Sequence, residues 1–120
     1  MQKTRNPVTR PAVLRKRDDF LRLNKSDTRI SCHSLVVQTL PNQKLGLRYG
    51  ITVTKKTAQN ATDRNRIKRR FRALVNDILA DAKLGNRDIV LIGKMAAATR
   101  PYEQLKKDLL WCLKKLGLVD

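Results

Sequence analysis

The segment Arg64-Asn-Arg-Ile-Lys-Arg-Arg-Phe-Arg72 decides how this chain folds, because it specifies a helix with one apolar and one strongly positive side. Six of its nine side chains are permanently cationic. Ile67 and Phe71 are four positions apart, which places both on one stripe of an α-helix. No acidic residue falls between Arg64 and Asn76, and arginine presents a planar fork that binds phosphate in two places. The segment therefore predicts a helix that docks on a protein core and on a polyanion at once.

This helix extends beyond the segment in both directions. Asn60 or Thr62 can cap its start, and it should run to about Lys83 with Gly85 as the stop signal. Its apolar stripe is predicted to consist of Ile67, Phe71, Leu74, Val75, Ile78 and Ala82.

Two segments that precede this helix are predicted strands. Residues 30–40 are rich in β-branched side chains and can bend into two strands. Residues 47–54 alternate, with Leu47, Tyr49, Ile51 and Val53 on one face and Arg48, Gly50, Thr52 and Thr54 on the other. Because the second face is small and polar, a ligand can approach it closely. We expect the two segments to pair in antiparallel fashion.

Three further elements complete the predicted fold. Asp18 can cap a short helix that runs to about Lys25. Residues 88–93 read as a strand that is buried on both faces, and Thr99 and Pro101 begin a final helix. The order helix–strand–strand–strand–helix–strand–helix predicts an α+β sandwich, in which three helices pack on a small four-stranded sheet.

The composition favours a single nucleic-acid-binding domain. The chain has 120 residues, and 27 basic against 10 acidic side chains give a net charge of +17, with a sequence pI of about 10.8. Domains that bind nucleic acid commonly have a pI above about 9. We expect a flexible basic arm over residues 1–12 and one nucleic-acid-binding domain over residues 13–120. The arm is either a soluble tail or a segment that condenses onto phosphates.

Other features bear on the compartment and on the partner. No stretch is long and apolar enough to span a bilayer, and no apolar region follows the charged start, so we expect a cytoplasmic protein without a signal peptide. Cys32 and Cys112 are interpreted as buried thiols in a reducing compartment.

The residues themselves indicate a binder and not a catalyst. His33 is the only histidine, whereas hydrolysis of a phosphodiester usually needs converging carboxylates or a pair of histidines. Asp77 and Asp81 share a helix face, and we interpret them as charge balance for a basic helix. No catalytic residue, protein-held metal or small-molecule substrate is expected. Among the aromatic residues, Phe20 is the candidate for stacking on a nucleotide, and Tyr49, Phe71 and Trp111 are assigned to the core.

The pattern Gly50-Ile-Thr-Val-Thr-Lys-Lys56, followed after seven residues by Arg64-Asn-Arg-Ile-Lys-Arg69, resembles the signature of the bacterial ribonuclease P protein component. Arg15-Lys-Arg-Asp-Asp-Phe20 is similar to the first helix of that family. Asp88-Ile-Val-Leu-Ile92 and Tyr102-Glu-Gln-Leu-Lys-Lys107 are similar to its last strand and helix. The resemblance extends over roughly residues 13 to 116 by eye.

This resemblance implies both an activity and a fold. In the family a large RNA carries out catalysis, and the protein binds that RNA and the 5′ leader of precursor tRNA. The holoenzyme removes the leader in a Mg²⁺-dependent hydrolysis, so no cofactor is expected on the protein alone. The implied topology is that of a ribosomal-protein domain with a left-handed β–α–β crossover, an exception to the usual handedness. One monomeric protein is expected per catalytic RNA.

The resemblance also implies roles for individual residues. The side chains that would face the catalytic RNA are Arg64, Asn65, Arg66, Lys68, Arg69 and Arg72. Those that would line the leader-binding cleft or border it are Phe20, Val36, Gln38, Thr52, Thr54, Lys55 and Lys56. Some relatives carry an aromatic residue where Asn24 and Gln38 stand here, so weaker stacking on the leader is expected. A stand-alone RNA-binding protein and a self-sufficient nuclease are the alternative functions.

Overall fold

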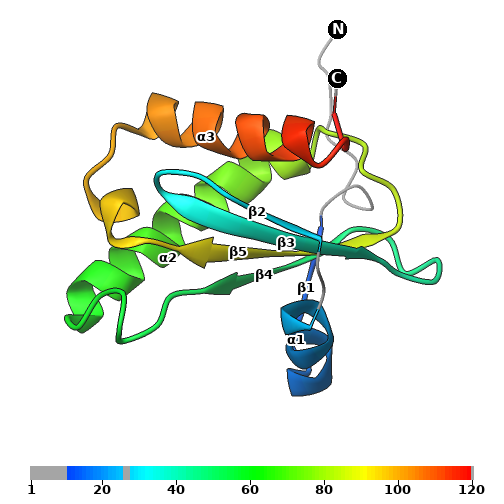
Figure 1. The fold of residues 1–120 in the computed structure, drawn as a ribbon, viewed down its shortest axis with the longest axis horizontal. Helices are drawn as coiled ribbons and strands as arrows, with labels where there is room; N and C mark the ends of the chain where they lie inside the picture. The colour runs from blue at the N-terminus through cyan, green and yellow to red at the C-terminus, as the bar shows by residue number, and fades with distance from the viewer. Residues whose placement is uncertain (1–10, 26–27, 120) are drawn as a thin grey trace, which may run out of the picture.

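The computed structural model describes residues 11–25 and 28–119, which form one mixed sheet with helices on both faces (Figure 1). The strands lie in the order β1-β4-β5-β3-β2. The elements are β1 (Ala12–Val13), α1 (Arg17–Asn24), β2 (Arg29–Ser31), β3 (Leu35–Pro41), β4 (Arg48–Thr52), α2 (Ala61–Leu74), the π-helix η2 (Val75–Leu79), β5 (Arg87–Gly93), the 3₁₀ helix η3 (Met95–Ala98) and α3 (Tyr102–Lys115). The α+β class and the three α-helices are as predicted.

The sheet has five strands and not the four that were predicted. The additional strand is β1, in which Ala12 pairs with Arg48 and Val13 with Tyr49, parallel to β4. A strand of two residues carries no readable periodicity, so the sequence gives no signal for it. Ala12 belongs to the predicted arm, whose first ten residues lie outside the described part of the chain.

The expected pairing of residues 30–40 with residues 47–54 is wrong. The first segment does bend into two strands, β2 and β3, which pair with each other. However, β5 lies between β3 and β4, antiparallel to the former and parallel to the latter. β5 is the third of the five strands and therefore the central strand of the sheet, which explains its continuous apolar sequence.

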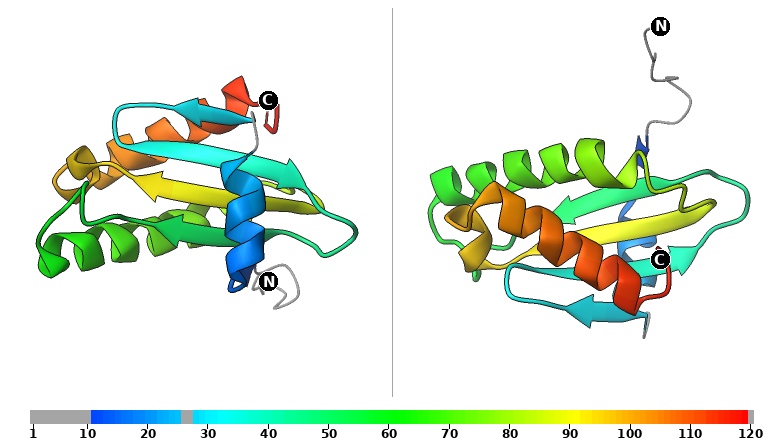
Figure 2. Two further views of the ribbon diagram at one scale, coloured as in Figure 1. Left: turned by 60° about the horizontal axis from the view of Figure 1, so that its bottom comes forward. Right: turned by 90° about the horizontal axis from the view of Figure 1, so that it is seen from above.

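The two faces of the sheet are covered differently. Helices α2 and α3 lie together on one face, and α1 crosses the other (Figure 2). The connection from β4 through α2 to β5 is a left-handed crossover in these views, as the resemblance implies. The larger core fills the α2–α3 side, and a smaller cluster around Leu14, Leu23 and Val90 lies under α1.

The long helix is shorter than predicted. It begins at Ala61, with Asn60 in the N-cap position, but α2 ends at Leu74 and continues only as the π-helical turn η2 to Leu79. The backbone N–H of Ala80 donates to the carbonyl of Val75 over 3.0 Å, which is the five-residue spacing of a π-helix. In α1 the predicted cap is also displaced, since the helix begins at Arg17.

Candidate nucleic-acid interface

The apolar side of α2 is buried as predicted. Ile67, Phe71 and Leu74 are fully buried in the larger core. Because these residues fix the rotation of α2, its cationic side chains face outward. Asn65, Arg66, Arg69 and Arg72 are exposed and Lys68 is half-buried.

Arg64 stabilises the start of α2 through hydrogen bonds to backbone carbonyls. Its Nη1 donates to the carbonyls of Ala58 and Gln59, each over 2.8 Å. The guanidinium therefore ties the loop that leads into α2 to the first turn of the helix. Because Arg64 remains only half-buried, it can still present its free edge to a polyanion.

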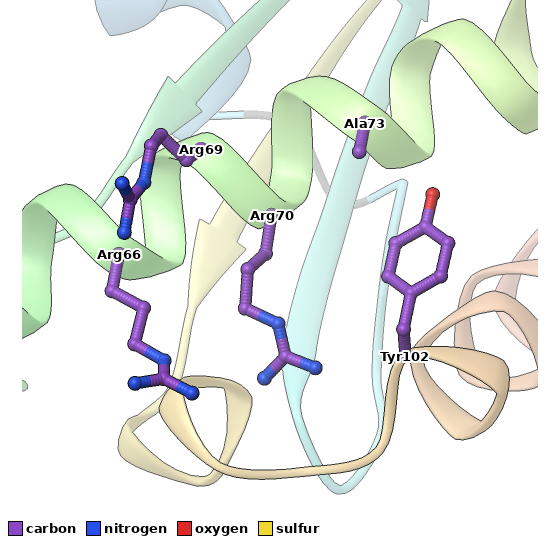
Figure 3. Close-up of a pocket in the computed structure, with 5 residues that line it drawn as sticks. All are labelled: Arg66, Arg69, Arg70, Ala73 and Tyr102. Carbon is purple, nitrogen blue, oxygen red and sulfur yellow. The ribbon is translucent and has the colours of Figure 1, made fainter.

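An open cavity of about 620 Å³ lies between α2 and α3, and it is lined by Arg66, Arg69, Arg70, Ala73 and Tyr102 (Figure 3). Figure 3 shows three guanidinium groups of α2 on one side and the Tyr102 ring on the other. None of the five lining residues is acidic. A concave surface that is lined by three cations suits an anionic group such as a phosphate.

Arg70 is held in this cavity by backbone atoms. Its Nη1 donates to the carbonyl of Ala97 over 2.7 Å, and its Nη2 donates to the carbonyl of Arg100. Burial, and secondarily the charge of Arg66, lowers the pKa of Arg70 from its ordinary value. The guanidinium stays charged, because an arginine pKa starts above about 12.

Tyr102 closes the α3 side of the cavity. Its hydroxyl donates to Oδ2 of Asp77 over 2.5 Å. Burial, followed by the bond to Asp77, raises the pKa of Tyr102. Sequence reasoning missed Arg70 and Tyr102 as members of one site, because no local pattern links positions so far apart.

The opposite face of the sheet carries most of the predicted leader-binding residues. The register places Val36, Ile92 and Thr52 in one row across β3, β5 and β4. Gln38, Val90 and Gly50 form the adjacent row, which lies closer to α1. Ile92, which was not among the predicted site residues, lies between Val36 and Thr52 in the first of these rows.

Phe20 of α1 rests directly on this face. A Cβ atom placed on Gly50 would lie 2.6 Å from two ring atoms of Phe20, which is too close for any real contact. The absence of a side chain at Gly50 therefore allows the ring of Phe20 to pack directly against β4. Phe20 remains half-buried, so part of the residue is accessible to a ligand.

The remaining predicted members of the cleft differ in accessibility. Gln38 is only 2% exposed, and among the described residues its Oε1 has no hydrogen-bond partner. Gln38 is thus covered and presents almost no surface to a ligand in this conformation. Thr54, Lys55 and Lys56 are exposed in the connection between β4 and α2.

A buried carboxylate that the sequence analysis did not identify anchors α1. Asp88 is fully buried and accepts hydrogen bonds from Arg48 (2.7 Å from each of two nitrogens), Asn42 (2.8 Å) and Arg22. Desolvation alone would raise the pKa of Asp88, but the hydrogen bonds from Arg48 and Asn42 and the charges of Arg48 and Arg22 outweigh it, and the pKa is lowered. Arg22 thereby connects α1 to the central strand.

The assignment of aromatic residues to the core is wrong for Trp111. Phe71 is buried and Tyr49 packs against the larger core, but the side chain of Trp111 is 44% exposed on α3. Cys32 and Cys112 are free thiols, half-buried and buried respectively. Among the described residues, no group of three potential metal ligands comes together, and no helix is long and apolar enough to cross a bilayer.

This sandwich, with arginines gathered on one face and the ring of Phe20 packed on the other, has the features of a small polyanion-binding protein. The family model described as Ribonuclease P matches residues 8–117. The chain therefore belongs to the ribonuclease P protein family, which supplies the protein subunit of the RNA–protein enzyme that processes the 5′ end of tRNA.

Individual relatives agree with this assignment. The ribonuclease P protein component of Erythrobacter litoralis is 43% identical over 106 residues, which cover 88% of this chain and 86% of that protein. The corresponding protein of Paramagnetospirillum magneticum is 37% identical, over 89% of this chain and 84% of that protein. Among solved structures, the RNase P proteins of Staphylococcus aureus and Thermotoga maritima superpose with TM-scores of 0.75 and 0.72, each at 28% identity. These superpositions cover 90% and 85% of this chain, and 97% and 94% of those chains.

Proposed function

We propose that this chain binds the catalytic RNA of ribonuclease P through α2, binds the 5′ leader of precursor tRNA through the cleft beside α1, and so promotes removal of the leader. The observation that supports this division is the placement of two different surfaces on opposite faces of one sheet. The α2 surface carries three converging guanidinium groups, and the nearby Asp77 carboxylate is bonded to the Tyr102 hydroxyl. The cleft combines the ring of Phe20 with the row formed by Val36, Ile92 and Thr52.

Each surface has the chemistry that its proposed partner requires. Structured RNA presents a dense array of phosphates, which Arg66, Arg69 and Arg72 can contact without reading sequence. The leader is single-stranded, so its bases can stack on an aromatic ring and its backbone can follow Lys55 and Lys56. Binding on both faces at once allows the protein to reduce the repulsion between the two RNA molecules.

In this proposal the protein supplies adhesion, and the RNA supplies the chemistry. Mg²⁺ belongs to the holoenzyme, and the protein lowers the Mg²⁺ concentration that the RNA needs by raising substrate affinity. One protein monomer serves each catalytic RNA. Because tRNA maturation takes place in the cytoplasm of bacteria, we place the protein there.

Reconstitution tests the proposal. Purified protein is mixed with precursor tRNA at low Mg²⁺, with and without the cognate catalytic RNA, and release of the leader is measured. Cleavage that requires both components supports the proposal. Cleavage by the protein alone would identify a nuclease, and RNA binding without any stimulation of cleavage would identify a stand-alone RNA-binding protein.

The division between the two surfaces is tested by separate titrations. Arg69→Ala should weaken binding to the catalytic RNA more than contact with the leader, and Phe20→Ala should do the reverse. The matched control is Lys44→Gln, which removes one exposed positive charge from the turn between β3 and β4. Equal losses for Arg69→Ala and Phe20→Ala in both titrations would refute the division.

A further inference from the structure

The outward face of α3 carries exposed apolar side chains between lysines. Trp111 is 44% exposed and the neighbouring Leu110 is 38% exposed, although both belong to a helix whose other apolar residues are buried. Nζ of Lys115 lies 5.5 Å from the centroid of the Trp111 ring. Lys107 is one helical turn before Trp111, and Lys107 and Lys114 are also exposed.

Acidic residues do not neutralise this face. Asp108 is turned toward the sheet, where it accepts hydrogen bonds from Arg100 and Ser34, each over 2.6 Å. Glu103 is paired with Lys106 at 3.4 Å near the start of the helix. The sequence has no other acidic residue between Asp108 and Asp120, so every charged side chain in the second half of α3 is a lysine.

We infer that this face of α3 is a second contact surface for the catalytic RNA, on which Trp111 stacks against an unpaired base and Lys107, Lys114 and Lys115 pair with the flanking phosphates. The inference rests on the proposed function, because it adds a contact to the same RNA. Aromatic rings bordered by cations are the surfaces on which proteins bind single-stranded nucleic acid.

The position of α3 favours the catalytic RNA, and not the leader, as the partner of this face. Helices α2 and α3 lie on the same face of the sheet, whereas the cleft beside α1 is on the opposite face (Figure 2). The two helices share the arginine-lined cavity, whose α3 wall is Tyr102. Nζ of Lys106 lies 5.5 Å from the centroid of the Tyr102 ring, and the exposed Lys107 follows it in the chain. Trp111 is about two and a half turns beyond Tyr102 and projects from the other side of α3, so an RNA bound in the cavity crosses over the helix to contact it.

Other occupants fit the face less well. A second copy of the chain would bring Lys107, Lys114 and Lys115 against the same three cations, which repel one another. A lipid bilayer requires a broad apolar face, but the apolar side of α3 is occupied by the core, and only Leu110 and Trp111 are exposed. A polyanion with flat, unpaired bases matches both the charge and the ring.

The single tryptophan of the chain makes the inference directly measurable. The emission of Trp111 and its quenching by acrylamide are recorded while the full-length protein is titrated with catalytic RNA, and binding is followed independently by anisotropy of labelled RNA. We expect the emission to fall and the ring to become protected from acrylamide as the RNA binds. RNA that binds by anisotropy but leaves both signals unchanged would overturn the inference while leaving the proposed function intact.

Variants provide the second measurement. Trp111→Leu should weaken binding of the catalytic RNA about tenfold, because leucine has no ring that can stack on a base. Lys107→Gln and Lys114→Gln should each reduce the slope of log affinity against log salt by about 0.7. The matched controls, Leu45→Ser and Lys44→Gln in the turn between β3 and β4, should change neither quantity. A change of Trp111 emission with protein concentration alone would instead assign the face to a second copy.

Discussion

Phe20 and Gly50 form a steric pair, in which the ring of one residue occupies the space that a side chain on the other would need. Phe20 belongs to α1 and Gly50 to the middle of β4, and a Cβ atom at Gly50 would lie 2.6 Å from the ring. Glycine in the interior of a strand usually marks such a close approach. The position of α1 above the sheet, and with it the wall of the proposed leader cleft, depends on this absence.

The variant Gly50→Ala should displace the Phe20 ring, lowering the free energy of unfolding by about 2 kcal/mol and weakening leader binding. In a Phe20→Ala background the same substitution should cost almost nothing, because the next nearest atom, Cβ of Leu14, is at 3.6 Å. Chemical denaturation of the four proteins in this double-mutant cycle measures the coupling between the two positions. Additive effects would show that the ring and the methyl group do not compete for space.

The variant Asp88→Asn should lower the free energy of unfolding by about 3 kcal/mol, which is more than for Gly50→Ala. The reason is that it leaves Arg48 and Arg22 without their shared carboxylate. The loss should also free α1, since Arg22 joins that helix to β5. Thermal or chemical unfolding measures the stability, and hydrogen exchange over residues 17–24 measures the release of α1. Glu103→Gln, on an exposed residue whose ion pair with Lys106 lies at the surface, is the comparison variant and should stay close to the parent protein.

The same carboxylate predicts how stability depends on pH. The pKa of Asp88 is lowered in the folded protein, so its contribution to stability is fully present above the unfolded pKa of about 3.9. That contribution is lost as the pH falls through the lower, folded pKa. Unfolding free energies measured between about pH 5 and pH 2 should therefore fall less steeply for Asp88→Asn than for the parent protein. Part of the slope should persist in the variant, because the pKa of Asp108 is also lowered.

Much of this fold is encoded in local periodicity and was predictable for that reason. The stripe of Ile67, Phe71 and Leu74 gave the position and rotation of α2, and the alternation along residues 47–54 gave the two faces of β4 correctly. Non-local pairing was not predictable in the same way. The insertion of β5 between β3 and β4 joins segments about 40 residues apart, and nothing in either segment specifies its neighbour.

The same contrast between local patterns and non-local packing applies to the candidate site. The cationic residues of α2 could be identified from one short segment, but the cavity also needs Tyr102, which only the packing of α3 on α2 brings near Arg70. Trp111 was misassigned because it lies within five consecutive apolar residues, Leu109 to Leu113. A helix can bury only one side, and α3 turns Leu109, Cys112 and Leu113 inward and leaves Trp111 outside.

Arg70 and Arg69 are neighbours with different roles, and substitution should separate them. Arg70→Ala removes the hydrogen bonds to the carbonyls of Ala97 and Arg100, so we expect a stability loss of about 2 kcal/mol together with weaker RNA binding. Arg69 makes no hydrogen bond or ion pair with the described residues, so Arg69→Ala should weaken RNA binding with little effect on stability. Parallel measurements of unfolding and of catalytic-RNA affinity decide the matter, and a stability loss for Arg69→Ala equal to that for Arg70→Ala would contradict the assignment.

The salt dependence of RNA binding should report how many phosphates the arginine surface neutralises. Each ion pair with a duplex phosphate contributes about −0.9 to the slope of log affinity against log salt, and each pair with a single-stranded phosphate about −0.7. Arg66→Gln and Arg69→Gln should therefore each make the slope for catalytic RNA shallower by about 0.7–0.9, and the double variant by about twice as much. Lys44→Gln removes the same charge from a distant turn, so it separates local pairing from the overall charge of +17. If the control shifted the slope as much as the α2 variants do, binding would depend on net charge alone, and the convergence of guanidinium groups beside Tyr102 would have no part in recognition.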